Sequence, residues 1–307
     1  MPQPAWTSGP PKIILFATDL SGRCDRALDR AAQLARLWHA RMIVLHVLDP
    51  KEEAVAQALF EDLPSWRRPP DRAQMVMRQI RRDLHETLPS VAELPDVEVR
   101  IEEGDPAVRI DEVARSTGAG LIVTGVARDE TFGRQVLGAT VQRLARKTSI
   151  PLLVVKSRAR PYREVLVATD FSPSSRHALD AALAFFPDVP KTLFHAFEVP
   201  FPALLDKGNA REEFRAMEQK ACELFLAEAG LSPEARKNLT TVVEHGAPPT
   251  MVRAHMEDKN VDLVVVGTHG RTAAYDALIG STAKRILEWA PGDVLLVRDP
   301  KSVKPGT

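Results

Sequence analysis

The sequence predicts two tandem α/β domains, each with a parallel β-sheet flanked by helices. Short β-branched runs alternate with amphipathic helical patterns, which is typical of parallel α/β folds. The whole alternation occurs twice, and the chain of 307 residues has the length of two ordinary domains. The apolar fraction of 44% and the charged fraction of 27% match those of soluble globular proteins, so disorder is excluded as the main state.

The repeat is visible as four pairs of matching segments. An offset of 151 positions relates KIILFATDLS at 12–21 to REVLVATDFS at 163–172, and an offset of 142 relates the third and fourth pairs. A repeat of this length indicates a duplicated domain rather than a solenoid. We therefore expect one domain at 1–157 and a second at 161–307, named unit one and unit two below. The other matching pairs are ARMIVLHVLD with PKTLFHAFE, VRIEEGDPAVRIDEVA with TVVEHGAPPTMVRAHM, and AGLIVTG with VDLVVVG.

Five strands are expected in unit two, each a short run rich in β-branched residues. The fourth, DLVVVG, is apolar without alternation, as is LIVTG in unit one. Continuous apolar runs of this kind are typical of strands buried on both faces of a parallel sheet. The expected strands of unit two cover residues 165–170, 192–197, 240–245, 262–267 and 293–298.

Helices are expected between the strands. In unit two the first helix begins where Ser172 can cap and Pro173 can take the first helical position. A basic helix near 71–88, preceded by an irregular loop at 49–70, corresponds to a helix at 209–229 in unit two. The first helix of unit one is predicted by an i, i+3, i+4, i+7 apolar stripe that consists of Cys24, Ala27, Leu28, Ala31, Leu34, Ala35 and Trp38.

Composition excludes several classes of function. Lys and Arg together total 41, and Asp and Glu together also total 41. The resulting net charge of zero argues against a strongly basic surface for binding nucleic acid. No apolar run approaches the roughly 20 residues of a membrane helix, and residues 1–12 show no signal-peptide pattern. Cys24 and Cys222 are too few for a disulfide framework or a zinc site, and packed thiols are expected. We expect a cytoplasmic protein with no nucleic-acid or membrane partner.

A glycine-rich segment follows the fourth strand of unit two and precedes a helical pattern. Gly267 and Gly270 are three positions apart, nine residues follow, and Gly280, Ser281 and Thr282 stand where the helix begins. Glycines can take a positive φ and let backbone amides approach an anion, while the helix start and its hydroxyls add donors. A tight turn before a capped helix would use the same residues. The strand before, the helix after and an altered copy in unit one favour a phosphate site.

An acidic residue ends the first strand of unit two. In open α/β sheets, ligands bind outside the carboxyl ends of strands where the strand order reverses. If the first and fourth strands are neighbours there, Asp170 faces the same crevice as the glycine-rich segment, and its carboxylate suits ribose hydroxyls. His46 and His195 stand in corresponding second strands, so a shared core hydrogen bond is expected. His245 and His269 are further candidates for the crevice.

This arrangement resembles the universal stress protein family in its tandem form. The spacing Gly-x2-Gly-x9-Gly-Ser/Thr is that family's ATP-binding signature, and unit two matches it fully. The resemblance covers nearly the whole chain. It implies a Rossmann-like (adenine nucleotide alpha hydrolase-like) α/β fold with five parallel strands per domain, the last used for dimer-like pairing. It also implies ATP, with or without Mg²⁺, as the ligand.

The resemblance implies a role for each residue of the site. Asp170 is expected at the ribose or adenine, and backbone groups of Ala196 at the adenine. His269 and Arg271 lie inside the loop and are expected to add contacts, although Arg271 could equally be a solvated side chain. The phosphates are expected on Gly267, Gly270, Gly280, Ser281 and Thr282.

Unit one departs from the signature. It retains Gly125, Gly138 and Asp19, but Arg128 replaces the second glycine and Ala139 replaces the serine. A bulky residue disfavours positive φ and fills space that phosphates need. We therefore expect unit one to bind ATP poorly or not at all. The alternative is that Arg128 folds over an anion as a replacement donor.

Three functions remain open from the sequence. The first is an ATP-binding regulatory protein of the stress-response type, which requires that ATP bind two states with different affinity. The second is a slow ATPase or a nucleotidyl transferase, although there is no Walker lysine, no dinucleotide fingerprint and no unmistakable base. We assign no catalytic or metal-binding residue. The third is an interaction scaffold with both sites empty. In each case PLLVV and VLLVR can pair the units as an intramolecular pseudo-dimer, and two chains can pair again as a homodimer.

Overall fold

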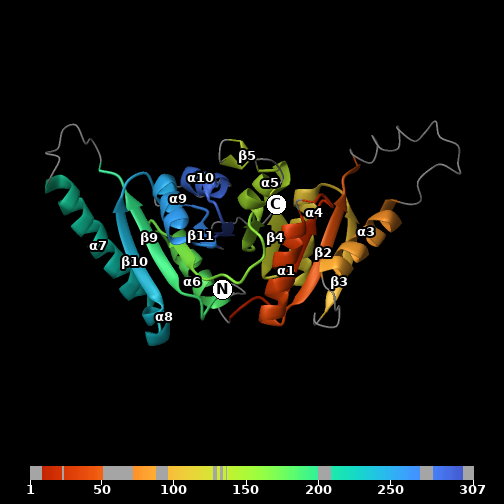
Figure 1. The fold of residues 1–307 in the computed structure, drawn as a ribbon, viewed down its shortest axis with the longest axis horizontal. Coiled ribbons are helices and arrows are strands. Elements are labelled where there is room, and N and C mark those ends of the chain that lie inside the picture. Colours follow the sequence, from red (N-terminus) through yellow and green to blue (C-terminus); the bar gives the residue numbers. More distant parts are fainter. Residues whose placement is uncertain are drawn as a thin grey trace, which may run out of the picture.

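Ten strands form one continuous sheet through both units, in the order β10-β9-β8-β11-β12-β7-β4-β1-β2-β3 (Figure 1). The computed structural model describes residues 9–22, 24–50, 72–87, 96–126, 130–131, 134–135, 137–199, 209–269 and 279–299. Unit one contributes β1 (Ile13–Thr18), β2 (Arg41–Leu48), β3 (Val97–Glu103), β4 (Leu121–Gly125) and β7 (Leu152–Val155). Unit two contributes β8 (Val165–Ala168), β9 (Lys191–Phe197), β10 (Leu239–His245), β11 (Leu263–Gly267) and β12 (Asp293–Val297). A separate hairpin pairs β5 (Glu130–Thr131) with β6 (Arg134–Gln135).

Strand direction divides the sheet into two equivalent halves. Among the described strands of this sheet, every pairing is parallel except that of β7 with β12, where Leu153 lies opposite Leu295. Counted along each unit, the order from the outer edge is third, second, first, fourth, fifth. This is a Rossmann-like order with a reversal between the first and fourth strands. The predicted fold class is confirmed, and the two fifth strands pair the units.

Helices cover both faces of the sheet, and each face carries helices from both units. α1 and α6 lie toward the centre of the molecule, whereas α3 and α7 lie at its far ends (Figure 1). A short helix, α8 (Pro233–Lys237), precedes β10. One hydrophobic cluster joins the sheet to α1 (Asp25–Trp38), α3 (Arg72–Thr87), α6 (Pro173–Phe185) and α7 (Asn209–Ala229). The second cluster joins it to α4 (Pro106–Thr117), α5 (Ala139–Lys147), α9 (Pro248–Lys259) and α10 (Ser281–Trp289).

Local sequence signals place the helices where they were expected. Ser172 caps α6 by accepting a hydrogen bond at Oγ from the Ser175 amide at 3.2 Å, and Pro173 opens the helix. The apolar stripe of α1 is buried from Cys24 to Trp38. α3 and α7 match the two predicted helices. The predicted irregular loop at 49–70 lies, apart from its first two residues, outside the described residues.

A buried polar network joins the two units. Arg30 of α1 is 1% exposed and donates from Nε to Asp293 Oδ2 at 3.0 Å. Tyr162 donates its hydroxyl to the same oxygen at 2.7 Å, and Ser157 donates its hydroxyl to Oδ1 at 2.8 Å. Burial raises the pKa of the Tyr162 hydroxyl well above its usual value, and the Asp293 carboxylate adds to the effect. Because the ion pair is fully hydrogen-bonded, its burial is tolerated, and it connects α1 of unit one to β12 of unit two.

Candidate functional site

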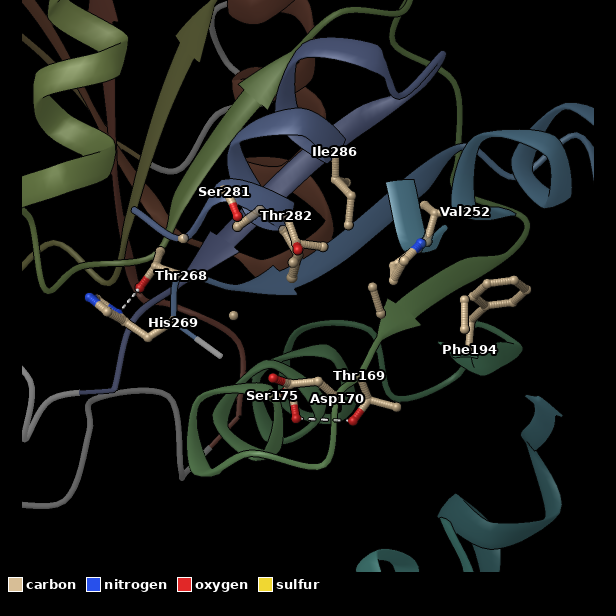
Figure 2. A pocket seen from close by; sticks show the side chains of 17 residues that line it. Thr169, Asp170, Ser175, Phe194, Val252, Thr268, His269, Ser281, Thr282 and Ile286 are labelled. Carbon is tan, nitrogen blue, oxygen red and sulfur yellow. Dashed lines mark hydrogen bonds between the residues drawn. The ribbon is translucent and has the colours of Figure 1, made fainter. Parts of the chain in front are cut away.

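A cavity of about 310 Å³ lies at the carboxyl ends of β8, β9 and β11, against the start of α10 (Figure 2). β8 and β11 pair directly, so the strand order reverses here, which is the condition for Asp170 to face the glycine-rich segment. Two predicted site residues, Gly270 and Arg271, lie outside the described residues. The other seven line the cavity: Asp170, Ala196, Gly267, His269, Gly280, Ser281 and Thr282.

One side of the cavity is apolar. In Figure 2, Phe194 and Val252 lie across the cavity from His269. An apolar lining with a few polar groups is typical of small-molecule sites, and a flat heterocyclic base suits this side. Sequence reasoning placed only Ala196 here. The period of two along β9 could have found Phe194, because residues 194 and 196 share one face of the sheet. The apolar side is formed by Phe194, Ala196, Pro248, Val252 and Ile286.

The first turn of α10 forms a polar side. Gly280 is its N-cap, and the Gly280 amide donates to the Thr268 carbonyl oxygen at 2.8 Å. No described side chain caps this turn, so the amides that follow Gly280 are left for a ligand. Ser281 and Thr282 are exposed and add hydroxyls beside those amides. Backbone donors, hydroxyls and the positive end of the helix dipole together suit an anion.

The two described glycines of the motif lie close to other parts of the chain. A Cβ on Gly267 would lie 2.6 Å from Ser174 Oγ and 2.7 Å from the Ser174 carbonyl carbon, so the packing of α6 on β11 excludes a larger residue. A Cβ on Gly280 would lie 3.3 Å from the Thr268 carbonyl oxygen. Neither glycine has a positive φ. The expectation of positive φ is therefore wrong for Gly267 and Gly280, and only at Gly267 does the packing require so small a residue.

Asp170 lies at the end of β8 and also orders the local backbone. Its Oδ1 accepts from the Ser172 amide at 3.1 Å, across Phe171, which has a left-handed φ of 62°. Unit one repeats this turn, because Asp19 Oδ1 accepts from the Ser21 amide at 2.9 Å. The carboxylate holds a turn that a non-glycine residue seldom adopts. The turn by itself therefore explains the presence of the acid in both units.

A buried histidine in each unit holds the end of the first strand. Nδ1 of His195 lies 2.8 Å from the Thr169 carbonyl oxygen, and Nδ1 of His46 lies 2.9 Å from that of Thr18. A carbonyl oxygen only accepts, so both Nδ1 atoms carry the proton. The predicted shared core hydrogen bond is confirmed. Nε2 of His195 lies 3.2 Å from the Glu218 carboxylate, which connects α7 to the strand end beside the cavity.

The two other histidines proposed for the crevice differ in position. His269 lines the cavity, and its Nδ1 shares a hydrogen bond with Thr268 Oγ1 at 2.9 Å. His245, at the end of β10, packs edge-on against Phe197 with ring centroids 5.5 Å apart and does not belong to the cavity lining. Of the pair, only His269 is available to a ligand in this cavity.

Unit one has a cavity of about 530 Å³ at the equivalent place. Val126 stands at the position of Thr268, and Ala139 at that of Ser281, so two hydroxyls are absent. Arg128 lies outside the described residues, and its filling of the phosphate space stays a prediction. The lining residues that are identical at the equivalent positions of the two cavities are Ala17, Thr18, Asp19, Pro106, Gly125, Gly138 and Thr140 of unit one.

The described part of the chain shows no reactive thiol and no metal-binding cluster. Cys24 and Cys222 are buried free thiols, as predicted, and burial raises the pKa of Cys24 to about 11. Among the described residues, no group of three or more His, Cys, Asp or Glu side chains is arranged to hold a metal ion. None of the described helices combines the length and the apolar character that crossing a membrane requires.

Comparison with known protein families identifies the class. The family described as Universal stress protein family matches residues 11–156 and 161–298. The chain belongs to the universal stress protein family and contains the family domain twice.

Curated relatives match either the whole chain or about half of it. A universal stress protein of Mycolicibacterium smegmatis is 27% identical over 302 residues, which cover 93% of this chain and 96% of the relative. One from Methanocaldococcus jannaschii is 26% identical over 162 residues, or 52% of this chain and 95% of the relative. A solved universal stress protein from Archaeoglobus fulgidus has a TM-score of 0.61 at 20% identity, covering 94% of this chain and 98% of that one. A functionally unknown protein from Pseudomonas aeruginosa has a TM-score of 0.64 at 21% identity, covering 98% and 96%. At these identities the structural likeness supports the fold alone.

Proposed function

We propose that this chain is an ATP-binding universal stress protein with a regulatory role in a stress response, and that unit two holds the nucleotide. The observation that carries the proposal is the cavity of unit two, which joins an apolar side, a carboxylate and an uncapped helix start. An adenine nucleotide presents matching groups in the same order along the molecule. A flat base is followed by the ribose diol and then by the anionic phosphate chain. The units themselves are proposed to extend over 1–157 and 161–307.

Each part of the nucleotide has a counterpart in the cavity. The base is proposed to lie against Phe194, with the backbone of Ala196 hydrogen-bonding its edge. The ribose hydroxyls donate to Asp170, and the phosphates accept from the amides and hydroxyls of Ser281 and Thr282. Mg²⁺, when present, would arrive bound to the phosphates. The remaining contacts are assigned to Gly267, His269, Gly270, Arg271 and Gly280.

The cavity of unit one is itself proposed to bind ATP poorly or not at all. Its cavity is larger than that of unit two, but Val126 and Ala139 supply no hydroxyl to a phosphate chain. The retained Asp19 is explained by its turn with Ser21. The nucleotide is therefore expected at one site per chain.

Two alternatives have some support. A slow ATPase would need a base, and the titratable side chains lining the described cavity are Asp170 and His269. Asp170 already accepts a backbone hydrogen bond, so hydrolysis, if present, should be slow. A nucleotide-independent scaffold is supported by Gly267, because its close packing against Ser174 requires a glycine even without a ligand. The exposed hydroxyl of Ser281 has no such packing reason.

The location is proposed to be the cytoplasm. The antiparallel pairing of β7 with β12 supports an intramolecular pseudo-dimer of the two units within a single chain. A homodimer is the alternative. Size-exclusion chromatography with light scattering distinguishes the two, and cell fractionation tests the location.

The central experiment is calorimetric titration of the full chain with ATP, with and without Mg²⁺. One site per chain is expected, and mass analysis of ligand released from freshly purified protein should identify an adenine nucleotide. Two sites of equal affinity would contradict the preference for unit two. Absence of binding would favour the scaffold, and phosphate release on incubation with Mg²⁺ would favour the ATPase.

A further inference from the structure

Each helix that starts at a cavity, α10 in unit two and α5 in unit one, has a cation from the other unit at its C-terminal end. α10 of unit two ends at Ala290, whose carbonyl oxygen accepts from Nζ of Lys156 at 2.9 Å. Lys156 is 4% exposed and directly follows β7 of unit one. Reciprocally, Arg298 follows β12 of unit two and donates from Nη1 to the carbonyl oxygen of Arg146, in the last turn of α5. Lys156 and Arg298 occupy equivalent positions, 142 residues apart.

The two helices differ in how much they need a cation from the other unit at their C-terminal end. α10 has no basic residue in its last turn, and Glu288, which is 7% exposed, adds negative charge there. The free carbonyls and the negative dipole end of a helix favour a cation, so Glu288 has the unfavourable sign. α5 carries Arg146 and Lys147 in its own last turn. Lys284 Nζ lies 3.9 Å from Glu288 Oε1, so α10 offsets part of this charge itself. Lys156 supplies the cation that contacts the carbonyl oxygen at the end of the helix.

The start of α10 is the part of the cavity that suits phosphates. The helix covers Ser281–Trp289 and is about 13 Å long, short enough to move as one rigid body. Its buried side packs into a core that the units share, and β6 of unit one also contacts it. A change in how unit one holds the end of α10 would therefore turn the amides at its start.

We propose that Lys156 of unit one is a positioning residue for the nucleotide site of unit two. By binding the Ala290 carbonyl oxygen, it holds α10 so that the amides of Ser281 and Thr282 face the phosphates. The buried ammonium also complements the dipole whose other end binds the anion. Unit one thereby contributes to ATP binding without a nucleotide of its own. This inference rests on the proposed function of unit two.

The test compares Lys156→Met with Arg298→Met in the full chain. Both variants remove a buried cation that caps a helix of the other unit, but only the first acts on α10. Titration with Mg²⁺–ATP should show about tenfold weaker binding for Lys156→Met, the upper range for a partly buried charge at a helix end. Arg298→Met should keep the parent affinity while lowering the melting temperature to a similar extent. Lys156→Arg, which retains the cation, should restore binding.

Hydrogen exchange supplies a second readout. Amides of α10 should exchange faster in Lys156→Met than in Arg298→Met, and amides of α5 should show the reverse. If Lys156→Met does not fold, Lys156→Gln keeps an N–H donor without the charge and takes its place with the same expected result.

The outcomes separate this inference from the proposed function. Parent affinity in both variants overturns the positioning role and leaves ATP binding intact. An equal loss of affinity in both variants also overturns it, because general loosening of the interface then explains the effect. A parent chain that binds no ATP overturns the proposed function, and the positioning role with it.

Discussion

Replacing Ser281 with alanine separates nucleotide binding from folding. Ser281 is exposed at the first position of α10, so the change should alter the free energy of unfolding by no more than about 0.5 kcal/mol. A hydrogen bond to a charged group contributes about 1.5–3 kcal/mol, and about 1.4 kcal/mol is a factor of ten in affinity. The Kd for ATP should therefore rise about ten- to a hundredfold.

The assay is calorimetric titration with Mg²⁺–ATP, combined with urea denaturation of the same preparations. Ser232→Ala is a matched control, because Ser232 caps α8 by accepting from the Ala235 amide at 3.2 Å, far along the chain from the site. That variant should lose about 1 kcal/mol of stability and keep its affinity for ATP. Parent affinity in Ser281→Ala would refute the assignment of the phosphates to the start of α10.

Three further predictions test other parts of the argument. Gly270→Arg, which copies Arg128 of unit one, should abolish ATP binding in the titration, and tight binding by this variant would contradict the site. Arg30→Met leaves a buried carboxylate without its cation and should lower the free energy of unfolding by about 3–5 kcal/mol in urea. As a control, Arg26→Met removes one hydrogen bond to the Lys156 carbonyl oxygen at 3.0 Å and should lower the free energy of unfolding by about 1 kcal/mol. Equal losses in the two variants would show that the buried ion pair adds no more stability than this single hydrogen bond. The raised pKa of Cys24, about 11, leaves roughly 0.1% thiolate at pH 8, so iodoacetamide should modify it slowly in the folded chain and faster as the pH rises toward 11. Rapid modification at pH 8 would mean that this thiol is not packed.

The elements were predictable because their signals are local. The cap at Ser172, the stripe of α1 and the apolar run of β11 each depend on residues within one or two turns or one strand. The strand order within each half was left as a condition, because alternating strands and helices limit the possible arrangements without selecting one. The duplication then supplied a second copy of every signal.

The site was predictable only in part. The glycine-rich segment and Asp170 stand next to strand ends in the sequence, so their meeting at one cavity followed from the topology. Val252 was missed, because its place on the apolar side of the cavity depends on how α9 packs across β9. The role given to Gly267 was incomplete, because its contact with Ser174 joins residues that are distant along the chain.

The amino-acid sequence by itself determined the duplication, the α/β class and the difference between the two glycine-rich segments, since each is a comparison of neighbouring or repeated residues. It also predicted that the fifth strands pair the units, but only the tertiary structure decided which buried side chains join them. Arg30 corresponds to Ala181 in unit two, and Asp293 corresponds to Pro151 in unit one, so their ion pair has no copy in the repeat. Such contacts form where antiparallel β7 and β12 bring distant buried charges together, and desolvation then requires that each find its partner.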